Sequence, residues 1–322
     1  MQAIQIVDDE LVWQDFPTED CPPGHVRIAV RASALNRADL VQRGGGYPPP
    51  PGASPIMGLE CAGEVAELGE GVQRVTLGDR VCALLAGGGY ASEVVVPAAQ
   101  VLPIPAGLSY AQAAAIPEVF ATAYLNLYME AGLQPGEKVL LHAGASGVGT
   151  AAIQMLQQTD NPSFVTAGSQ EKIQQCVTLG AQGGADRHDG SFLDTAREWC
   201  GEAGVDVILD PVGGQYLADN LALLALNGRL VLIGLMGGAQ ADIQLGQLMM
   251  KRARIIGSTL RARPVAEKAL VMDQLYERVW PNFENGKIVP IIEREFPIEE
   301  TAAAQALLAS NDTIGKIVLI VD

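Results

Sequence analysis

Short runs of alternating hydrophobic and polar residues fill the first third of the chain. Residues 26–30 and 63–68 are two such runs, and glycine and proline residues separate them from their neighbours. This alternation is typical of strands that bury one face, and the glycine and proline residues mark the turns between them. Residues 2–117 are therefore expected to form a compact β-rich domain.

The pattern changes near residue 121, where apolar runs begin to alternate with segments of helical spacing. These apolar runs cover residues 139–142, 163–167, 205–210 and 229–234. Alternation of strand and helix over this length indicates a doubly wound parallel sheet.

The last part of the chain contains helical stretches and ends in an apolar run at residues 315–320. We expect this strand to return to the β-rich domain. A chain of 322 residues is long for one domain, which favours two. The predicted division places residues 1–118 and 262–322 in one domain and residues 119–261 in an inserted domain, with a cleft between them.

One apolar strand runs into a glycine-rich turn and then a helix, with the sequence VLLHAGASGVG at residues 139–149. Such a turn holds the diphosphate of a dinucleotide at the helix N-terminus. We expect Gly144 to permit the tight turn, Gly147 to let backbone N–H groups approach the phosphates, and Gly149 to let the helix pack against the strand. Ser146 stands at the middle glycine position of the usual pattern and offers a hydroxyl to a phosphate oxygen. The predicted diphosphate contacts are Gly144, Ser146, Gly147 and Val148.

The residues after the next apolar run indicate which dinucleotide is favoured. An acidic residue there would hold the ribose 2′-hydroxyl and repel a 2′-phosphate. The chain instead has Gly168, Ser169 and Lys172, although Glu171 is adjacent. Because Ser169 can donate a hydrogen bond and Lys172 supplies a cation, NADPH is favoured over NADH, and Arg187 could close the same pocket. The alternative is that Ser169 caps the following helix and Lys172 is a solvated surface charge.

The 37 acidic residues exceed the 21 basic residues, which gives a formal charge of −16 with no basic stripe. This balance argues against a nucleic-acid partner. No apolar run reaches the roughly 18 residues of a membrane span, and the acidic, strand-like start does not resemble a signal peptide. A cytoplasmic protein without a membrane partner is expected. The five cysteines are scattered singly, which fits neither a zinc cluster nor a disulfide scaffold.

Several motifs spread over the chain resemble one family. They are ALNRADL (34–40), YPPPPGAS (47–54), GLE (58–60), GDRV (78–81), the AGASGVGTAAIQ turn and GLMGG (234–238). Together they are similar to the zinc-independent quinone oxidoreductases, the zeta-crystallin-like group of the medium-chain dehydrogenase/reductase superfamily, and most of all to its branch of tumour-suppressor-inducible enzymes. The resemblance implies an α/β protein with a GroES-like β-rich catalytic domain and a doubly wound Rossmann domain that binds NADPH.

The resemblance makes one absence meaningful. Zinc-dependent alcohol dehydrogenases of this superfamily place a cysteine and a histidine ligand where this chain has Asn36 and Leu59. Leucine cannot ligate a metal and asparagine is a poor zinc ligand, so no metal is expected. The four-cysteine structural zinc lobe is also missing after Val81. Glu60, which survives from the superfamily motif, is then expected to be a buried, hydrogen-bonded carboxylate.

Without a Lewis acid, the acceptor must take a hydride readily on its own. A quinone does so because hydride addition gives an aromatic product, and the protein needs only to hold the ring and donate hydrogen bonds. The candidate catalytic residues are Asn36 and Tyr47 as donors, with Asp39 orienting the loop or the nicotinamide ribose. All three could instead be structural, as turn, cap or loop-anchor residues.

The resemblance also implies further contacts around the nicotinamide end of NADPH. The residues concerned are Thr122, Leu235, Met236, Arg261, Asn311 and Lys316. His142 precedes the glycine turn and is expected to be a packed core histidine. No histidine is assigned to catalysis.

The expected activity is transfer of a hydride from NADPH to a quinone or a similar conjugated carbonyl. An NADPH-dependent enoyl ester or thioester reductase is the alternative, since Tyr47 could serve either chemistry. A non-catalytic alternative is a nucleotide- or RNA-binding crystallin-like protein. The resemblance implies a homodimer, for which residues 254–259 are an apolar candidate edge. The sequence leaves open the physiological acceptor, a one-electron or two-electron product and the size of the NADPH preference.

Overall fold

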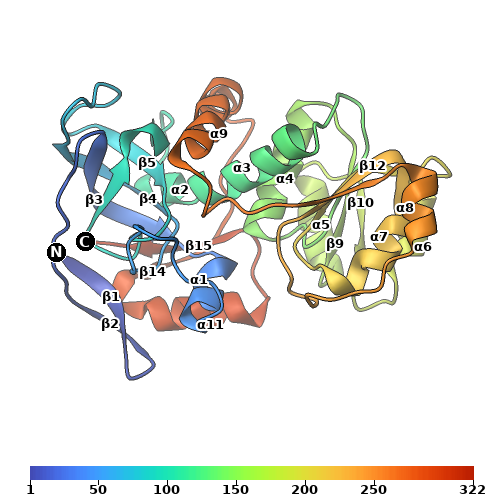
Figure 1. Cartoon of the computed structure of the whole chain (residues 1–322), viewed down its shortest axis with the longest axis horizontal. Helices are drawn as coiled ribbons and strands as arrows, with labels where there is room; N and C mark the ends of the chain where they lie inside the picture. Colours follow the sequence, from blue (N-terminus) through green and yellow to red (C-terminus); the bar gives the residue numbers. More distant parts are fainter. The chain divides into compact units, whose positions relative to one another are not determined.

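The computed structural model describes all 322 residues, which divide into two compact units (Figure 1). Unit 1 comprises Met1–Ala121 and Leu260–Asp322, and unit 2 comprises Thr122–Thr259. Each unit is built around its own main sheet.

Unit 1 contains a seven-stranded sheet in the order β14-β15-β3-β4-β5-β7, with β6 paired to β3. The strands are β3 (His25–Ala34), β4 (Glu60–Leu68), β5 (Arg80–Leu84), β6 (Glu93–Pro97), β7 (Val101–Pro103), β14 (Ile292–Pro297) and β15 (Lys316–Ile320). A separate hairpin pairs β1 (Gln2–Val7) with β2 (Glu10–Asp15). β15 runs antiparallel to β3, so the last strand of the chain lies beside one of the first.

Alternation along β3 explains how this sheet buries one face. Val26, Ile28 and Val30 are buried, whereas Arg27 and Ala29 between them are partly exposed. The three buried side chains belong to one hydrophobic core with residues of the neighbouring strands. Side chains of successive strand residues point to opposite faces, so this pattern places the hydrophobic set on the core side.

The helices of unit 1 pack around this sheet. They are α1 (Arg37–Arg43), α2 (Tyr110–Ala114), α3 (Pro117–Tyr124, whose end lies in unit 2), α9 (Val265–Arg278), α10 (Trp280–Glu284) and α11 (Thr301–Ser310), with short 3-10 turns η1 (Ala98–Gln100) and η4 (Ile298–Glu300). No helix in the chain is both long and apolar enough to span a lipid bilayer.

Unit 2 contains a six-stranded parallel sheet in the order β10-β9-β8-β11-β12-β13. Its strands are β8 (Val139–Leu141), β9 (Ser163–Ala167), β10 (Gly183–Asp186), β11 (Val205–Asp210), β12 (Leu224–Leu232) and β13 (Arg254–Gly257). The chain leaves β8 in one direction and later continues from β11 in the other. This reversal is the switch point at which doubly wound sheets bind their ligands, and it confirms the predicted parallel sheet.

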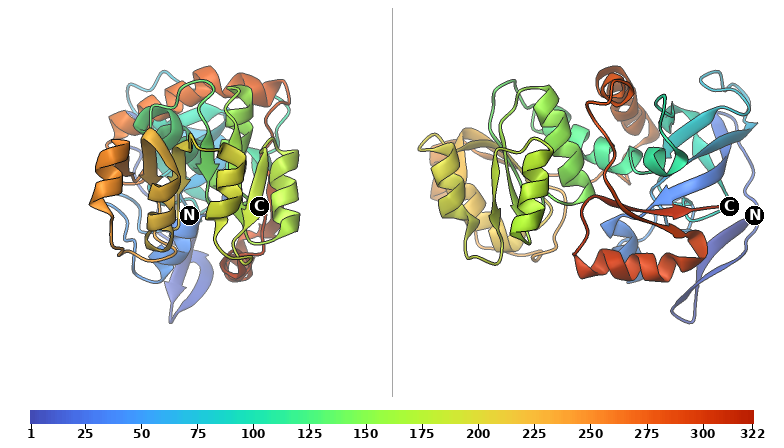
Figure 2. Two further views of the ribbon diagram at one scale, coloured as in Figure 1. Left: turned by 90° about the vertical axis from the view of Figure 1, so that its right-hand side faces the viewer. Right: turned by 180° about the vertical axis from the view of Figure 1, so that it is seen from behind.

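Helices lie on both faces of this sheet (Figure 2). They are the π-helix η2 (Leu125–Glu130), α4 (Gly147–Gln158), α5 (Gln170–Thr178), α6 (Phe192–Cys200), the 3-10 turn η3 (Gly214–Tyr216), α7 (Leu217–Leu223) and α8 (Leu245–Lys251). The crossovers through α4 and α5 run one way along the sheet, and those through α6, α7 and α8 run the other way. Because such crossovers are right-handed, the two groups cover opposite faces.

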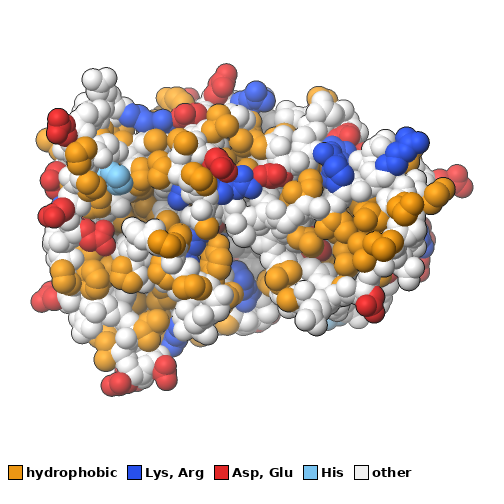
Figure 3. Space-filling model, in the orientation of Figure 1, with side chains coloured by type: hydrophobic (Ala, Val, Ile, Leu, Met, Phe, Trp, Pro, Cys, Tyr) orange, Lys and Arg blue, Asp and Glu red, His pale blue; other side chains and the backbone are white.

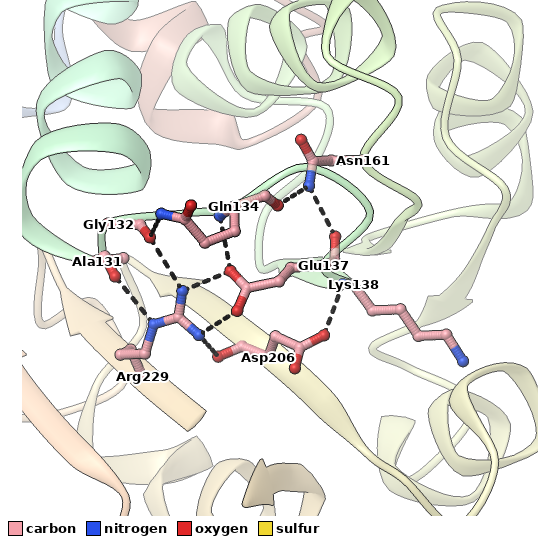
Figure 4. A network of polar contacts seen from close by, with 8 residues as sticks. All are labelled: Ala131, Gly132, Gln134, Glu137, Lys138, Asn161, Asp206 and Arg229. Carbon is pink, nitrogen blue, oxygen red and sulfur yellow. Dashed lines mark hydrogen bonds and ion pairs between the residues drawn. The ribbon is translucent and has the colours of Figure 1, made fainter. Parts of the chain in front are cut away.

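An ion pair of a buried arginine joins elements at the amino-terminal edge of the unit 2 sheet (Figure 4). Arg229 on β12 is 6% exposed, and its guanidinium donates to the two carboxylate oxygens of Glu137 at 2.9 and 2.5 Å. It also donates to the carbonyls of Ala131 at 2.9 Å, Gly132 at 3.4 Å and Asp206 at 3.4 Å. The segment after η2 is thereby fixed to the start of β11 and to β12.

Hydrophobic side chains gather on the surface of unit 2 where α8 lies (Figure 3). Leu245, Met249 and Met250 of this helix are 61%, 75% and 81% exposed. The neighbouring β13 is an edge strand that pairs only with β12.

Candidate active site

The glycine turn between β8 and α4 passes close to the adjacent strand β9. Ala143, rather than Gly144, has the positive φ, at 53°. Gly144 is required because a Cβ there would lie 2.5 Å from the Cβ of Val165 on the adjacent β9. Because Gly144 has no side chain, the turn can pass close to the next strand.

Gly149 allows α4 to pack directly on the turn that follows β8. A Cβ on this residue would lie 2.3 Å from the carbonyl oxygen of Gly144. Ser146 is the N-cap of α4, and its hydroxyl accepts a hydrogen bond from the N–H of Gly149 at 3.1 Å. The N–H groups of Gly147 and Val148, in the first turn, have no intrahelical partner and point out of the helix end. These donors and the helix dipole favour an anion at this position.

Arg187 and the residues after β9 lie close together. The N–H of Arg187 donates to the carbonyl of Ala167 at 2.9 Å, and a Cβ on Gly168 would lie 3.3 Å from the Arg187 guanidinium. Ser169 is the N-cap of α5 and accepts from the N–H of Lys172 at 3.2 Å. The capping alternative for Ser169 is thus observed, while the hydroxyl keeps its own proton to donate. Gly168, Ser169, Lys172 and Arg187 all lie shortly after β9 or β10, at the carboxyl end of the sheet, and these four residues are called the polar rim below.

A buried chain of hydrogen bonds lies under the glycine turn. Nδ1 of His142 is 3.0 Å from the Thr166 hydroxyl, and its Nε2 is 2.7 Å from Oδ1 of Asn220. The Asn220 side chain donates in turn to the carboxylate of Asp210 at 3.0 Å. Since Oδ1 of Asn220 is an acceptor, His142 donates from Nε2, and burial lowers its pKa so that the ring is neutral. The expected core histidine is confirmed, but its two polar partners were not predicted.

The same hydrogen-bond network extends through Asp210 to the segment after β11. That segment in turn contacts the loop that follows β12. Asp210 accepts from the N–H groups of Val212 at 2.6 Å and Gly213 at 3.0 Å. The N–H of Met236 donates to the carbonyl of Pro211 at 3.2 Å. Leu235 and Met236, which were predicted to contact NADPH, are 56% and 52% exposed in this loop. Their backbone is therefore fixed while their side chains stay accessible.

Asn36, Glu60 and Lys316 form a compact buried cluster in unit 1. The Lys316 ammonium lies 2.8 Å from Oε1 of Glu60 and donates to Oδ1 of Asn36 at 2.8 Å, as well as to the carbonyl of Leu35. Nδ2 of Asn36 donates to Glu60 at 2.9 Å and to the carbonyl of Ala34 at 3.3 Å. Glu60 is completely buried, which confirms the expected buried, hydrogen-bonded carboxylate.

This cluster changes the interpretation of Asn36. Both N–H bonds and the oxygen of its amide already have partners, so it has no ready donor for a substrate. The structural alternative, in which Asn36 caps α1 and holds the loop, is the better description.

Asp39 is also a positioning residue. It is completely buried and accepts from the N–H of Asn36 at 2.7 Å, the N–H of Gly58 at 3.2 Å and the hydroxyl of Tyr90 at 2.8 Å. Burial raises the pKa of Asp39, and these hydrogen bonds together with the Lys316 charge oppose that rise. Of the two roles predicted for this residue, the geometry supports orientation of the loop.

Tyr47, which is partly exposed, packs against the buried Arg261 in unit 1. The Arg261 guanidinium lies 5.1 Å from the centre of the Tyr47 ring and donates to the Tyr47 carbonyl at 3.1 Å. It also donates to the carbonyl of Ala86 at 2.7 Å and to the side chain of Gln42 at 2.8 Å. Arg261 therefore holds the Tyr47 loop, and its predicted contact with NADPH stays a prediction. Burial, followed by the charge of Glu118, raises the pKa of Tyr47, so its phenol keeps a proton to donate.

Glu118 is the residue of this site that sequence reasoning missed. It lies in the first turn of α3, and its N–H donates to Oε2 of Glu60 at 2.8 Å. Its own Oε2 is buried without a hydrogen-bond partner. Burial and the Glu60 carboxylate raise the pKa of Glu118 to about 8. An acidic residue in a first helical turn is common because of the helix dipole, so the sequence carried no distinguishing signal.

Two other predicted residues lie at helix positions. Asn311 is the C-cap of α11 with a φ of 63°, and its Oδ1 accepts from the guanidinium of Arg37. Thr122 lies on α3, and its carbonyl accepts from the side chain of Asn126 at 2.7 Å. Their predicted contacts with NADPH stay predictions.

Two protein-family models match the chain. The alcohol dehydrogenase GroES-like domain matches residues 22–106, and the zinc-binding dehydrogenase model matches residues 147–275. A quinone oxidoreductase-like protein 2 homolog of Nematostella vectensis is 30% identical over 312 residues, which cover 96% of this chain and 85% of that protein. The chain belongs to the medium-chain dehydrogenase/reductase superfamily. The match also confirms the predicted GroES-like and Rossmann fold class.

Two solved structures resemble the whole chain. A mycobacterial protein solved in complex with NADPH is 26% identical with a TM-score of 0.87, and the alignment covers 100% of both chains. The CurK enoyl reductase is 28% identical with a TM-score of 0.84, covering 99% of this chain and 98% of that one. This superfamily member is therefore an oxidoreductase with relatives named for quinone reduction and for enoyl reduction.

Proposed function

We propose that this protein transfers a hydride from NADPH to a quinone, or to a similarly reactive conjugated carbonyl, without a catalytic zinc. The observation that carries the proposal is the Asn36–Glu60–Lys316 cluster. An ammonium group occupies the polar pocket between Asn36 and Glu60, and all of its acceptors are protein oxygens. Such a pocket offers an amide, a carboxylate and a resident cation, which is a poor donor set for zinc.

The glycine turn fits the diphosphate of a dinucleotide. The backbone at Gly144 and Gly149 leaves no room for a Cβ, and the N–H groups of Gly147 and Val148 face outward. Gly168, Ser169, Lys172 and Arg187 would hold the 2′-phosphate, with Thr122, Leu235, Met236, Arg261 and Asn311 proposed near the nicotinamide. When bound, NADPH supplies the hydride.

Tyr47 is the residue of this chain proposed to complete the reduction. An acceptor that has taken a hydride becomes an oxyanion or enolate, which needs a hydrogen bond and then a proton. The raised pKa of Tyr47 keeps its phenol protonated for this purpose. Arg261, stacked 5.1 Å from the ring centre, holds the phenol in place. Asp39 accepts from the N–H of Gly58, at the end of the segment between α1 and β4 that carries this tyrosine.

The test is oxidation of NADPH and NADH by metal-free protein, followed through the loss of the reduced nicotinamide absorbance. One reaction receives 1,4-benzoquinone and the other a crotonyl thioester. Faster oxidation of NADPH than of NADH with the quinone supports the proposal. Turnover with the thioester alone overturns it in favour of an enoyl reductase, which is the second candidate because of the similarity to CurK.

We also propose a homodimer that pairs the β13 edges of two copies. The support is the unpaired edge of β13 and the exposed Leu245, Met249 and Met250 beside it. Analytical ultracentrifugation of wild type and Met250→Glu tests this pairing. Wild type is expected to sediment as a dimer and Met250→Glu as a monomer. A dimer unchanged by this substitution would contradict it.

A further inference from the structure

Thr166 on β9 holds the glycine turn through two hydrogen bonds. Its hydroxyl accepts from the N–H of Ala143 at 3.3 Å, and its carbonyl accepts from the N–H of Gly144 at 2.9 Å. Ala143 has the positive φ of this turn, a conformation that is costly for a residue with a side chain and persists only where neighbouring groups hold it. Because the Thr166 oxygen accepts from Ala143, the hydroxyl can donate its own proton to a further partner.

That partner is His142, and from there the hydrogen bonds continue in one direction. Asp210 fixes the direction, since a carboxylate only accepts and so faces the NH2 group of Asn220 at 3.0 Å. Oδ1 of Asn220 therefore faces Nε2 of His142 at 2.7 Å, Nε2 carries the ring proton, and Nδ1 accepts from Thr166 at 3.0 Å. Hydrogen bonds aligned in this way polarise and strengthen one another. The side chains of Thr166, His142, Asn220 and Asp210 are called the buried relay below.

Two aromatic side chains fix the plane of the His142 ring. The ring of Phe192 lies 4.8 Å from it at an angle of 72°, and the ring of Tyr216 lies 4.7 Å from it at 48°. His142 is 3% exposed, so water does not compete for its two nitrogens. The ring cannot turn away from either polar partner without disturbing this packing. His142 is therefore a rigid link between Thr166 and Asn220.

The other end of the buried relay holds the loop at residues 234–238. Oδ1 of Asp210 accepts from the N–H groups of Val212 at 2.6 Å and Gly213 at 3.0 Å. The carbonyl of Val212 in turn accepts from the N–H of Gly237 at 2.7 Å. A Cβ on Gly237 would lie 2.6 Å from Cγ1 of Val212, so the loop packs directly on this segment. A continuous row of contacts thus joins the glycine turn to the loop at residues 234–238.

We propose that Thr166, His142, Asn220 and Asp210 are positioning residues that set the glycine turn and the loop at residues 234–238 together for one dinucleotide. This inference rests on the proposed function, in which both segments contact NADPH. A break at one end of the buried relay releases the other end, because each hydrogen bond orients the group that makes the next. The diphosphate and the nicotinamide are common to NADPH and NADH, so the buried relay acts on both dinucleotides alike.

Calorimetric titration of folded protein with NADPH and NADH is the first part of the test. Thr166→Val removes the hydroxyl at nearly constant shape, Thr166→Ser keeps it, and Asn220→Leu breaks the other end. Thr166→Val and Asn220→Leu should each raise both dissociation constants by about threefold to tenfold, the equivalent of one hydrogen bond, whereas Thr166→Ser should stay close to wild type. The control is Asn161→Leu, an equally buried asparagine that donates to the carbonyls of Gln134 and Glu137. It should leave both constants unchanged, and unchanged constants in Thr166→Val and Asn220→Leu as well overturn the proposal.

The second part asks whether the two ends are coupled. Its probe is 2′-phospho-ADP-ribose, which is NADPH without the nicotinamide and so reaches the glycine turn but not the nicotinamide contacts. Asn220→Leu should still weaken the binding of this probe by a similar factor, because the loss passes through His142 to the turn. Thr166→Val combined with Asn220→Leu should bind it less than about twofold more weakly than the weaker single variant, since one break already disconnects the buried relay. Full affinity for the probe in Asn220→Leu, or factors that multiply in the double variant, overturn the proposal.

The third part observes the His142 ring in cofactor-free protein. In NMR spectra of ¹⁵N-labelled protein, the His142 signals are those that disappear in His142→Phe. Nε2 should carry the proton and Nδ1 should be an acceptor, and the Nδ1 signal should shift in Thr166→Val but not in Asn161→Leu. A hydroxyl that only supports the turn would leave the Nδ1 signal unmoved. A proton on Nδ1, or an unmoved Nδ1 signal in Thr166→Val, overturns the proposal.

These measurements need no electron acceptor, so failure of this inference is distinguishable from failure of the proposed function. A protein that reduces no quinone but loses affinity for both dinucleotides in Thr166→Val and Asn220→Leu has lost the proposed reaction, while the positioning role stands. An active protein whose affinities do not change has lost this inference alone. A wild type that binds neither dinucleotide overturns both. If Asn220→Leu does not fold, His142→Phe, which keeps an aromatic ring beside Phe192 and Tyr216, takes its place with the same expected results.

Discussion

Each unit contains an ion pair between a glutamate and a buried cation, and the two pairs differ in completeness. Around Arg229 in unit 2, the guanidinium reaches both oxygens of Glu137 and three backbone carbonyls. Around Lys316 in unit 1, the ammonium and Glu60 are equally well paired, but the adjacent Glu118 keeps an unsatisfied buried oxygen. A complete network of this kind holds its elements together, whereas an unsatisfied buried group in an incomplete one carries a cost that calls for an explanation.

Removal of Lys316 should have the largest effect. Lys316→Met leaves the completely buried Glu60 carboxylate with hydrogen bonds but no countercharge. Breaking a fully buried pair in this way costs about 3–5 kcal/mol of unfolding free energy. Denaturant unfolding measures it, with Lys287→Met at an exposed position as the control.

A second variant separates the lost charge from the lost side chain. Glu60→Gln combined with Lys316→Met removes both charges, and it should recover part of the stability lost by Lys316→Met alone. A double variant as unstable as the sum of the two single variants would show that the pair is not energetically coupled.

Arg229→Met should have the next largest effect, and on stability alone. Its partner Glu137 is 24% exposed, so water can compensate part of the lost pairing. The expected cost is therefore smaller, about 2–3 kcal/mol of unfolding free energy. Because this pair lies at the amino-terminal edge of the sheet, kcat per folded molecule should not change. A fall in kcat that persists in fully folded Arg229→Met protein would show that the Arg229 ion pair affects catalysis as well as stability, contrary to this expectation.

The sequence predicted the frame of the molecule better than the contacts within it. Period-two alternation in segments such as β3, and the strand and helix rhythm after residue 121, depend only on local pattern, and both yielded the observed kinds of sheet. The close packing at Gly149 followed from its motif. The strain at Ala143 did not, because the positive φ is imposed by the turn as a whole.

The candidate site was harder to predict, since its chemistry depends on groups distant in sequence. Lys316 and Asn36 are separated by 280 residues, and only the pairing of β15 with β3 brings them together. Glu118 acquires its raised pKa from burial and from Glu60, neither of which a single acidic residue in a helical turn reveals. Tyr47 could be proposed because its loop motif is local, but its stacking on Arg261 could not.

A substitution in the polar rim of unit 2 should have a smaller effect, confined to the binding of one dinucleotide. Arg187→Gln removes a guanidinium beside Gly168 that is proposed to bind the 2′-phosphate. The dissociation constant of NADPH should rise about tenfold, which is the loss of roughly one charge-assisted hydrogen bond, while that of NADH stays the same. Calorimetric titration measures both. The control is Arg197→Gln on α6, whose side chain is half exposed. An equal rise in the dissociation constants of NADPH and NADH would mean that Arg187 stabilises the structure of the pocket and does not bind the phosphate.

Ser169 allows the finest distinction, because its hydroxyl caps α5 and is also proposed to reach the phosphate. Ser191 is a matched control, since it caps α6 by accepting from the N–H of Leu193 at 3.1 Å and is not part of the proposed site. Ser169→Ala and Ser191→Ala should each lower the unfolding free energy by about 1 kcal/mol, the usual value of an N-cap. Only Ser169→Ala should also weaken the binding of NADPH. The dissociation constant of NADPH should rise roughly twofold to fivefold, the equivalent of one neutral hydrogen bond. If both variants lose the same stability and neither changes NADPH affinity, Ser169 is a cap alone, and the preference for NADPH must come from Lys172 and Arg187.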